Sequence, residues 1–149
     1  MIFRVEETPL QVLIEDDLET LMLAHWKESS THQDADYDPD WPLALALERA
    51  GTLRAFGLFR DDELIGYSVY TISSHLLCKS TTFAFNTSIY VVPTRRGFAG
   101  GKLLRESEKL LKALGVRKVT YLAPRNSPLN DALRSFRHEH TENYWAKVI

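Results

Sequence analysis

The sequence predicts an α/β fold in which a mixed β-sheet is covered by helices. Three observations lead to this prediction. Apolar residues recur at spacings of three and four near the N-terminus, two apolar runs flank a tight polar turn, and a third run passes through glycines into a helical pattern. With 149 residues and no internal repeat the chain has the size of one domain, so we expect a single domain over residues 1–149.

The first half of the chain predicts a strand, two helices and a hairpin. Thr8-Pro9 supplies a cap and a proline for the first helical position, and Gly51 stops the second helix. The hairpin turns at Asp61-Asp62-Glu63. The apolar face of the first helix is formed by Leu10, Leu13, Ile14, Leu18, Leu21 and Met22. We expect strands at residues 2–5, 52–60 and 64–72, and helices at residues 9–27 and 40–50.

The second half predicts three more strands and two more helices. A mobile stretch at residues 73–80 leads into a long β-branched and aromatic run, and Gly115 ends the helix that follows it. Pro128 can open the last helix. We expect strands at residues 81–92, 116–122 and 142–149, and helices at residues 102–114 and 128–137, which completes the order β-α-α-β-β-β-α-β-α-β.

Composition excludes several classes of protein. The chain has 18 Lys and Arg against 20 Asp and Glu, a formal net charge of −2, and no basic stripe, which argues against a nucleic-acid partner. Cys78 is the one cysteine, so no intramolecular disulfide is expected and a reducing cytoplasm fits best. Neither an apolar span of about 20 residues nor a signal-peptide pattern is present, so we expect no membrane partner.

The stretch VVPTRRGFAGGKLL, residues 91–104, carries the clearest functional signal. A strand that enters a helix through small residues leaves several backbone N–H groups unpaired at the positive end of the helix dipole. Such a turn is an anion site, and a phosphate is the expected ligand. Arg95 and Arg96 add positive charge beside it.

Two common phosphate loops do not fit this stretch. A Walker A loop needs Gly where Arg96 lies and Ser or Thr where Leu103 lies. The dinucleotide pattern G-x-G-x-x-G, begun at Gly97, needs glycines at the positions of Ala99 and Lys102.

The same stretch resembles the acyl-CoA motif of the Gcn5-related N-acetyltransferases (GNAT family): a strand ending V-x-P, two residues, and then R/Q-x-x-G/A-x-G/A. Arg96, Ala99 and Gly101 fall on the motif positions, and the element order agrees over nearly the whole chain. The resemblance implies a mostly antiparallel sheet that splays between its fourth and fifth strands, with the pantetheine arm of acetyl-CoA in the gap. It also implies an oxyanion contact from the Val92 N–H. The implied cofactor-binding residues are Val91, Val92, Arg96, Gly97, Phe98, Ala99, Gly100, Gly101, Lys102 and Asn126. A cap or turn role explains Asn126 equally well.

The residues that would transfer protons depart from the family pattern. The family often has a Glu or Asp where this chain has Thr87, beside Ser88, and a Tyr where it has Leu133. Aligning ALRSFRH with the family's l-Y-x-x-x-G-F puts Arg137 at the Gly and His138 at the Phe. A water held by Thr87 and Ser88 is one way to move the proton, with His75 or His25 as substitute bases. Tyr121 is the candidate for the missing acid, although a sheet tyrosine is more often part of the core.

Two other clusters bear on function. Asp34, Asp36, Asp38 and Asp40 form either a solvated acidic loop or a surface that attracts a cationic amine; a calcium loop is excluded because Pro39 and Leu45 replace its required Gly and Glu. His138 and His140 lack a third ligand at suitable spacing, so no metal site is expected.

The sequence therefore predicts an N-acyltransferase that moves an acetyl group from acetyl-CoA, as co-substrate, to a primary amine of a small molecule or a protein. The alternative is a protein of this fold that binds CoA or a partner without turnover. An anion-binding module for another nucleotide is a third reading. This fold often dimerises, so a homodimer is among the expected assemblies.

Overall fold

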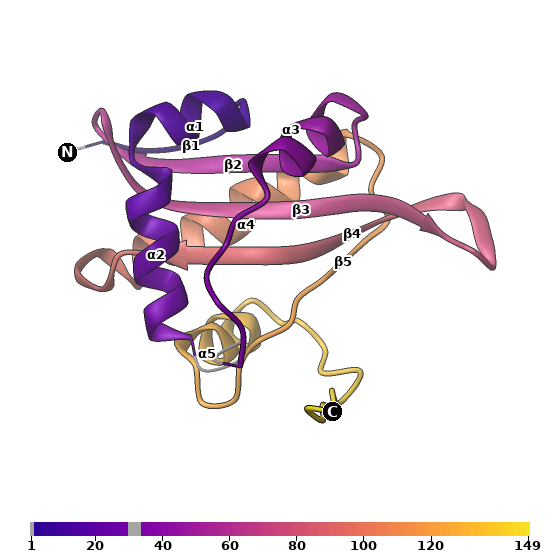
Figure 1. The fold of residues 1–149 in the computed structure, drawn as a ribbon. Coiled ribbons are helices and arrows are strands. Elements are labelled where there is room, and N and C mark those ends of the chain that lie inside the picture. The colour runs from indigo at the N-terminus through magenta and orange to yellow at the C-terminus, as the bar shows by residue number, and fades with distance from the viewer. Residues whose placement is uncertain (1, 30–33) are drawn as a thin grey trace.

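The computed structural model describes residues 2–29 and 34–149, and its sheet confirms the predicted mixed α/β fold. Five strands lie in the order β1-β2-β3-β4-β5 (Figure 1). The first four pair antiparallel, and the fifth pairs parallel with the fourth. The strands are β1 (Phe3–Glu7), β2 (Leu53–Arg60), β3 (Glu63–His75), β4 (Cys78–Val91) and β5 (Lys118–Thr120).

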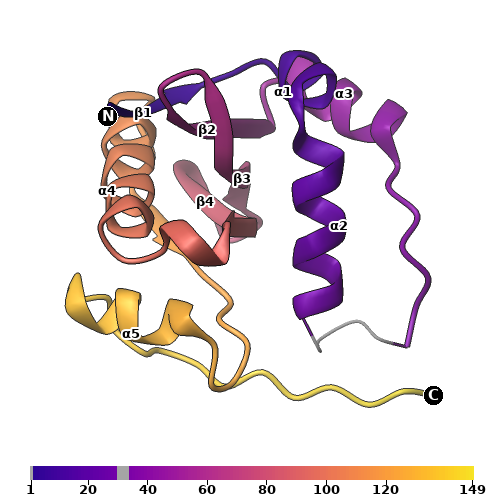
Figure 2. The ribbon, with the colours of Figure 1, turned by 90° about the vertical axis from the view of Figure 1, so that its left-hand side faces the viewer.

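Helices cover both faces of this sheet. Figure 2 shows α2 on one side of the strands and α4 on the other, with α5 and the extended C-terminal segment beneath them. A short 3-10 helix, η1 (Pro93–Arg95), joins β4 to α4. The helices are α1 (Leu10–Asp16), α2 (Leu18–Glu28), α3 (Trp41–Arg49), α4 (Phe98–Ala113) and α5 (Pro128–Ser135). Within the described residues, no helix combines the length and the apolar character needed to cross a bilayer.

One apolar layer fills each side of the sheet. Leu13 and Leu18, both 0 % exposed, belong to the cluster that joins α1 and α2 to β2, β3 and β4. On the other face Leu103, also 0 % exposed, packs in a cluster with Leu58 and Val91. Full burial of such a side chain contributes about 1.5–3 kcal/mol. Strands β2 and β3 are therefore held from both sides, which makes them a rigid base for β4.

The predicted helix over residues 9–27 is wrong in one respect, because the chain breaks at Asp17 into α1 and α2. Asp17 has φ −144°, and its N–H ends α1 by donating to the Leu13 carbonyl. Figure 1 shows the consequence, since α1 runs along the edge of the sheet and α2 runs across the strands. Periodicity does not detect the break, because the apolar spacing continues through it at Ile14, Leu18 and Leu21.

The strand lengths also differ from the predictions. β3 and β4 extend to His75 and Cys78, so the stretch over residues 73–80 is the end of a long hairpin. β5 covers only Lys118–Thr120, because its pairing with β4 stops at Phe85.

The strand predicted at residues 142–149 is absent. This segment has no regular secondary structure, and Trp145 is 91 % exposed. The alternating pattern supplies the side chains of a strand, but a strand also needs the backbone of a neighbour. In the described chain no strand lies beside this segment.

Helix α5 ends in a Schellman motif that has an arginine where glycine is usual. The N–H of His138 donates to the Leu133 carbonyl at 2.9 Å, and the N–H of Arg137 donates to the Arg134 carbonyl at 3.0 Å. Arg137 has φ +62°, the left-handed region. Arg137 is the residue that the sequence alignment places at the family's Gly, so the backbone here agrees with that alignment.

Replacing Arg137 with Gly is expected to stabilise the protein. A non-glycine residue in the left-handed region costs about 1 kcal/mol, and its relief raises the melting temperature by about 2–4 °C in a domain of this size. The measurement is thermal unfolding followed by circular dichroism. Arg134→Gly, one turn earlier in α5, is the control and should lower stability by about 1 kcal/mol. A lower melting temperature for Arg137→Gly would contradict the motif.

Candidate functional site

The candidate site lies where β4 and β5 part, and this splay between the fourth and fifth strands is the one that the fold prediction contains. The two strands pair only at Phe83 with Lys118, Ala84 with Val119 and Phe85 with Thr120. β4 then continues to Val91 with β3 as its neighbour, up to the pair Gly66 and Val91. One edge of β4 therefore has no strand partner over residues 86–91, and its backbone groups face a gap.

The ladder between β3 and β4 decides which backbone groups reach this gap. The Val92 N–H donates to the Ile65 carbonyl at 3.0 Å, so the prediction that it faces an acyl oxygen is wrong. Alternate residues of an antiparallel strand point their backbone groups to opposite sides. Val91 and Ile89 therefore direct their N–H groups toward the gap, and Val91 replaces Val92 as the residue suited to an oxyanion contact.

A β-bulge interrupts this ladder at Thr87. Val69 pairs with Ser88 and Tyr70 pairs with Asn86, so Thr87 has no opposite residue. The Thr87 hydroxyl and the Asn86 amide both donate to the Val69 carbonyl, at 3.1 and 3.2 Å. Bulges bend a strand and often re-aim side chains next to active sites. Here the bulge falls at the position where the sequence places the missing carboxylate.

The N-terminus of α4 follows directly after this edge. The helix begins at Phe98 and not at Lys102 as predicted, because Gly97, with φ +91°, is the N-cap and the Gly101 N–H already bonds the Gly97 carbonyl at 2.9 Å. Residues 97–100 consequently have N–H groups without intrahelical partners, and Gly97 offers no side-chain cap. This 16-residue helix therefore presents an anion site next to the gap.

The glycines of this turn have different roles. Gly97 adopts a backbone conformation that other residues rarely take, and a Cβ at Gly100 would meet nothing within 4 Å. A Cβ at Gly101 would lie 2.8 Å from the Phe136 ring, so this glycine is needed for packing against the residue that follows α5. Ala99 is buried, with 3 % exposure, in the core beneath the helix. Lys102 lies one turn into the helix, and its N–H is not among the free groups.

Arg96 ties the turn to α2. Its Nε donates to the Val91 carbonyl at 2.9 Å, and its guanidinium forms an ion pair with Glu28 at 2.7 Å. The guanidinium also lies over the Tyr90 ring, 5.5 Å from its centre. The hydrogen bond from Arg96 holds the pKa of Glu28 below its usual range. The side chain of Arg96 is therefore committed to the protein, and its backbone remains the part available to a ligand.

A second polar group, on the α2 face, is formed by His25, Tyr67 and Ser88. His25 Nδ1 lies 2.7 Å from the Tyr67 hydroxyl and 3.3 Å from the Ser88 hydroxyl, and the two hydroxyls are 3.3 Å apart. The imidazole stacks on Tyr90 at 5.1 Å and 20°. Burial lowers the pKa of His25. The sequence analysis names His25 only as a substitute base. Its place four residues after Leu21, on the face of α2 that meets the sheet, is the feature of the sequence that indicates its position.

Of the other predicted site residues, His75 lies away from this group and Asn126 lies in a turn. His75 pairs with Cys78 at the far end of the 14-residue β4, and its Nδ1 accepts from the Leu77 N–H. Asn126 is exposed and has φ +62°, a conformation that suits asparagine in a turn.

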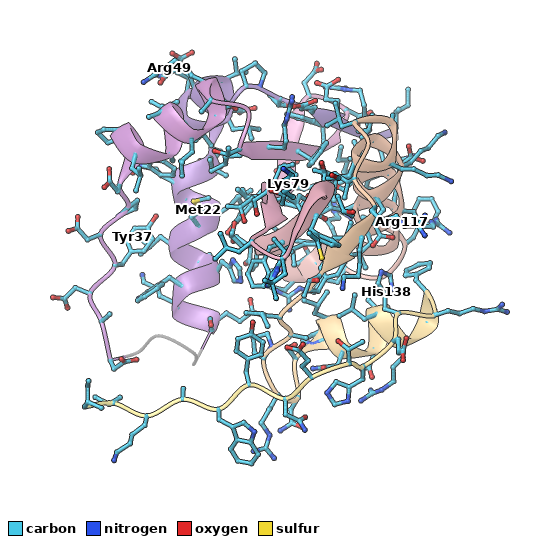
Figure 3. The ribbon with its side chains drawn as sticks, turned by 90° about the vertical axis from the view of Figure 1, so that its right-hand side faces the viewer. Met22, Tyr37, Arg49, Lys79, Arg117 and His138 are labelled. Atoms are coloured by element: carbon cyan, nitrogen blue, oxygen red, sulfur yellow. The ribbon has the colours of Figure 1, made fainter. Side chains whose placement is uncertain are left out.

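Tyr121 belongs to another network on the α4 face. Its hydroxyl donates to Glu108 at 2.7 Å and lies 3.1 Å from the Tyr70 hydroxyl. His138 reaches the same carboxylate at 2.7 Å; Figure 3 labels this residue at the end of α5. Burial raises the pKa of Tyr121. Its proton is already held by a carboxylate, which makes Tyr121 a poor acid for a leaving thiolate.

The acidic segment before α3 faces α2. Figure 3 shows Tyr37 pointing toward that helix, where its ring lies 5.8 Å from Trp26. Asp40 caps α3 through the Leu43 N–H at 2.9 Å, and Asp34, Asp36 and Asp38 are exposed. A cavity of about 360 Å³ lies elsewhere, between the C-terminal half of α4 and the start of β5, and none of its lining residues belongs to the gap.

Comparison with known proteins identifies the fold and the family. The chain resembles the aminoglycoside acetyltransferase meta-AAC0020 from an uncultured soil metagenomic sample, solved with trehalose, at a TM-score of 0.75 and 16 % identity, covering 99 % of this chain and 97 % of that one. It resembles the aminoglycoside N-acetyltransferase AAC(6')-Iy in complex with CoA at a TM-score of 0.72 and 20 % identity, covering 99 % and 95 %. It resembles the ribosomal-protein-alanine N-acetyltransferase of Brucella melitensis biovar Abortus 2308 at a TM-score of 0.68 and 17 % identity, covering 99 % of this chain and 98 % of that one.

No curated protein matches the chain by sequence. The family model described as "Acetyltransferase (GNAT) family" matches residues 15–139, which include the splayed strands, the turn at Gly97 and the whole of α4. The chain belongs to the GNAT family of acetyltransferases.

Proposed function

We propose that the chain is a single-domain N-acetyltransferase that moves the acetyl group of acetyl-CoA to a primary amine. The observation that carries the proposal is the direct succession of an unpaired strand edge, residues 86–91 of β4, and four free N–H groups at the start of α4. A ligand that is both a peptide-like arm and a pyrophosphate matches this arrangement. CoA has both parts.

The two parts of CoA would use different backbone groups. The amides of the pantetheine arm would take the place that β5 leaves beside β4, and the pyrophosphate would accept from the N–H groups of residues 97–100. Lys102 and Asn126 would flank the ligand. The acyl oxygen would lie at the Val91 N–H, where a donor stabilises the negative charge of the transition state.

The reaction would be direct attack. The neutral amine nitrogen bonds to the acyl carbon, the carbon–sulfur bond breaks, and CoA leaves as its thiolate. The amine loses one proton, and Thr87 and Ser88 are the polar side chains of β4 nearest to this step. Holding both reactants in line supplies a large part of the rate in such transfers.

The acceptor would approach from the α2 face. Asp34, Asp36 and Asp38 give that side negative charge, which attracts a cationic amine over a distance of about 8–10 Å at ordinary salt. The aminoglycosides and the ribosomal-protein alanine named for the similar structures offer amines of this kind. Both a small polyamine and a protein amine therefore belong in an acceptor test.

Binding of acetyl-CoA is expected to raise the melting temperature. Ligand at 100 times its dissociation constant adds about 2.7 kcal/mol, or about 5–10 °C here. Gly100→Glu should weaken binding by about tenfold or more, because it puts a carboxylate beside the N–H groups that hold the pyrophosphate. The added side chain has open space and should leave the free protein folded.

Gly100→Gln is the matched neutral control and should lose less affinity than Gly100→Glu. ATP and NADH serve as ligand controls. An equal shift for all three nucleotides would favour a general anion-binding module, and an undiminished shift in Gly100→Glu would remove the proposed pyrophosphate site.

Turnover is expected with at least one amine in a panel. Wild-type protein with acetyl-CoA should release CoA thiol saturably when given sisomicin, an alanine-terminated peptide, a lysine peptide or spermidine, and the acetylated amine should appear by mass spectrometry. Trehalose, which has no amine, is the control. Specific acetyl-CoA binding with no turnover on any amine would favour a non-catalytic CoA-binding protein. Thr87 and Leu133, which occupy the usual base and acid positions of the family, are consistent with that alternative.

A further inference from the structure

A connected chain of three polar side chains lies under α2, beside the proposed acceptor position. The Ser88 hydroxyl donates to the Tyr67 hydroxyl at 3.3 Å, and the Tyr67 hydroxyl lies 2.7 Å from His25 Nδ1. We propose that Ser88, Tyr67 and His25 form a proton relay that takes the proton lost by the acceptor amine. This inference rests on the proposed function, because it names the path of the proton within the same site.

The position of Ser88 makes it the entry of the relay. It follows the bulge at Thr87 and shares the α2 face of β4 with Tyr90, since both contact His25. Ser88 is partly exposed, whereas Tyr67 is 1 % exposed. The next residue, Ile89, turns its backbone to the gap. An amine at Ser88 would therefore lie one residue, about 3 Å along the strand, from the Ile89 N–H and three residues, about 10 Å, from the Val91 N–H, the two backbone donors that face the gap.

The hydrogen-bond directions allow proton transfer toward His25. Ser88 donates to the Tyr67 oxygen, so the Tyr67 proton is free to be donated to His25 Nδ1. In this arrangement Nδ1 is the basic nitrogen and Nε2 carries the ring proton. Stacking on Tyr90 at 20° fixes the plane of the ring. The hydrogen bonds of the relay are therefore in place before the amine binds.

The proposed step balances in atoms and charge. As the amine nitrogen bonds to the acyl carbon, its proton passes to Ser88 Oγ, the Ser88 proton passes to the Tyr67 oxygen, and the Tyr67 proton passes to Nδ1. The carbon–sulfur bond breaks, and the thiolate leaves with the bonding electrons. The products are an amide, a thiolate and an imidazolium, which then gives one proton to water.

The surroundings of His25 keep the imidazole neutral before the step. Burial lowers its pKa, with Glu28 opposing and Arg96 adding to the effect; the other titratable groups that face the cluster are Tyr37, Tyr67 and Tyr90. Burial also raises the pKa of Tyr67, which therefore keeps its proton at neutral pH. A base with a lowered pKa works until the pH falls through that value. The relay thus predicts an acidic limb of kcat below pH 6.5.

The first test needs no turnover. Nitrogen NMR of the imidazoles at pH 7.5, with the His25 signals assigned by their loss in His25→Gln, should show Nδ1 without a proton, Nε2 with one, and a pKa below 6.5. A His25 that carries its proton on Nδ1, or that is charged at pH 7.5, would overturn the relay, because Nδ1 could then not accept from Tyr67.

The second test is kinetic and uses an amine that the wild type acetylates. Ser88→Ala, Tyr67→Phe and His25→Gln should each lower kcat by about 100-fold or more, leave the acetyl-CoA melting shift in place, and abolish the acidic limb in His25→Gln. Ser88→Thr, which keeps a hydroxyl, should recover much of the rate. The control is His140→Gln, in the exposed C-terminal segment.

The outcomes separate the relay from the proposed function. Wild-type kcat in all three variants would overturn the relay and leave the acetyltransferase intact. A wild type that acetylates no amine would overturn the proposed function, and it would overturn the proposed relay as well.

Discussion

The site depends on one constraint: β4 has a full-length neighbour on one edge and loses its neighbour on the other after Phe85. The first edge fixes which backbone groups pair within the sheet, and the second leaves the N–H groups of Ile89 and Val91 without a strand partner, while the Val91 carbonyl accepts from Arg96. Buried backbone groups need partners, so an edge of this kind has to be satisfied by solvent or by a ligand with amide groups. The bulge at Thr87 lies on that edge, and the turn at Gly97 and the start of α4 follow it directly in the chain.

The two faces of the sheet supply different kinds of groups to the candidate site. The α4 face contributes a dipole and free N–H groups, both from the backbone, which suits a ligand recognised by charge. The α2 face contributes side chains: His25, Tyr67 and Ser88. Arg96 connects the faces, since it bonds the Val91 carbonyl at the strand edge and Glu28 at the end of α2. The position of α2 is thereby tied to the turn on which the pyrophosphate would lie.

Much of this fold could be predicted from local patterns. Hairpin turns, capping residues and the passage from strand to glycines to helix are short-range signals, and apart from the break at Asp17 they predict the order of the main helices and strands up to α5. The errors lie where tertiary partners decide. Asp17 turns the chain without changing its apolar spacing, and the segment after residue 141 has a strand pattern but no neighbour. The cluster at His25 joins residues 42 and 63 positions apart, so no local motif could reveal it.

Gly101 illustrates how one motif position can serve the fold and the ligand site together. Its missing side chain lets the Phe136 ring lie against the first turn of α4, and Arg105 covers the same ring at 5.1 Å. A Cβ at Gly101 would thus meet an aromatic ring that comes 35 residues later in the chain. A family pattern that retains a small residue at this position would persist in a relative that had lost its ligand altogether, as long as the aromatic partner remained.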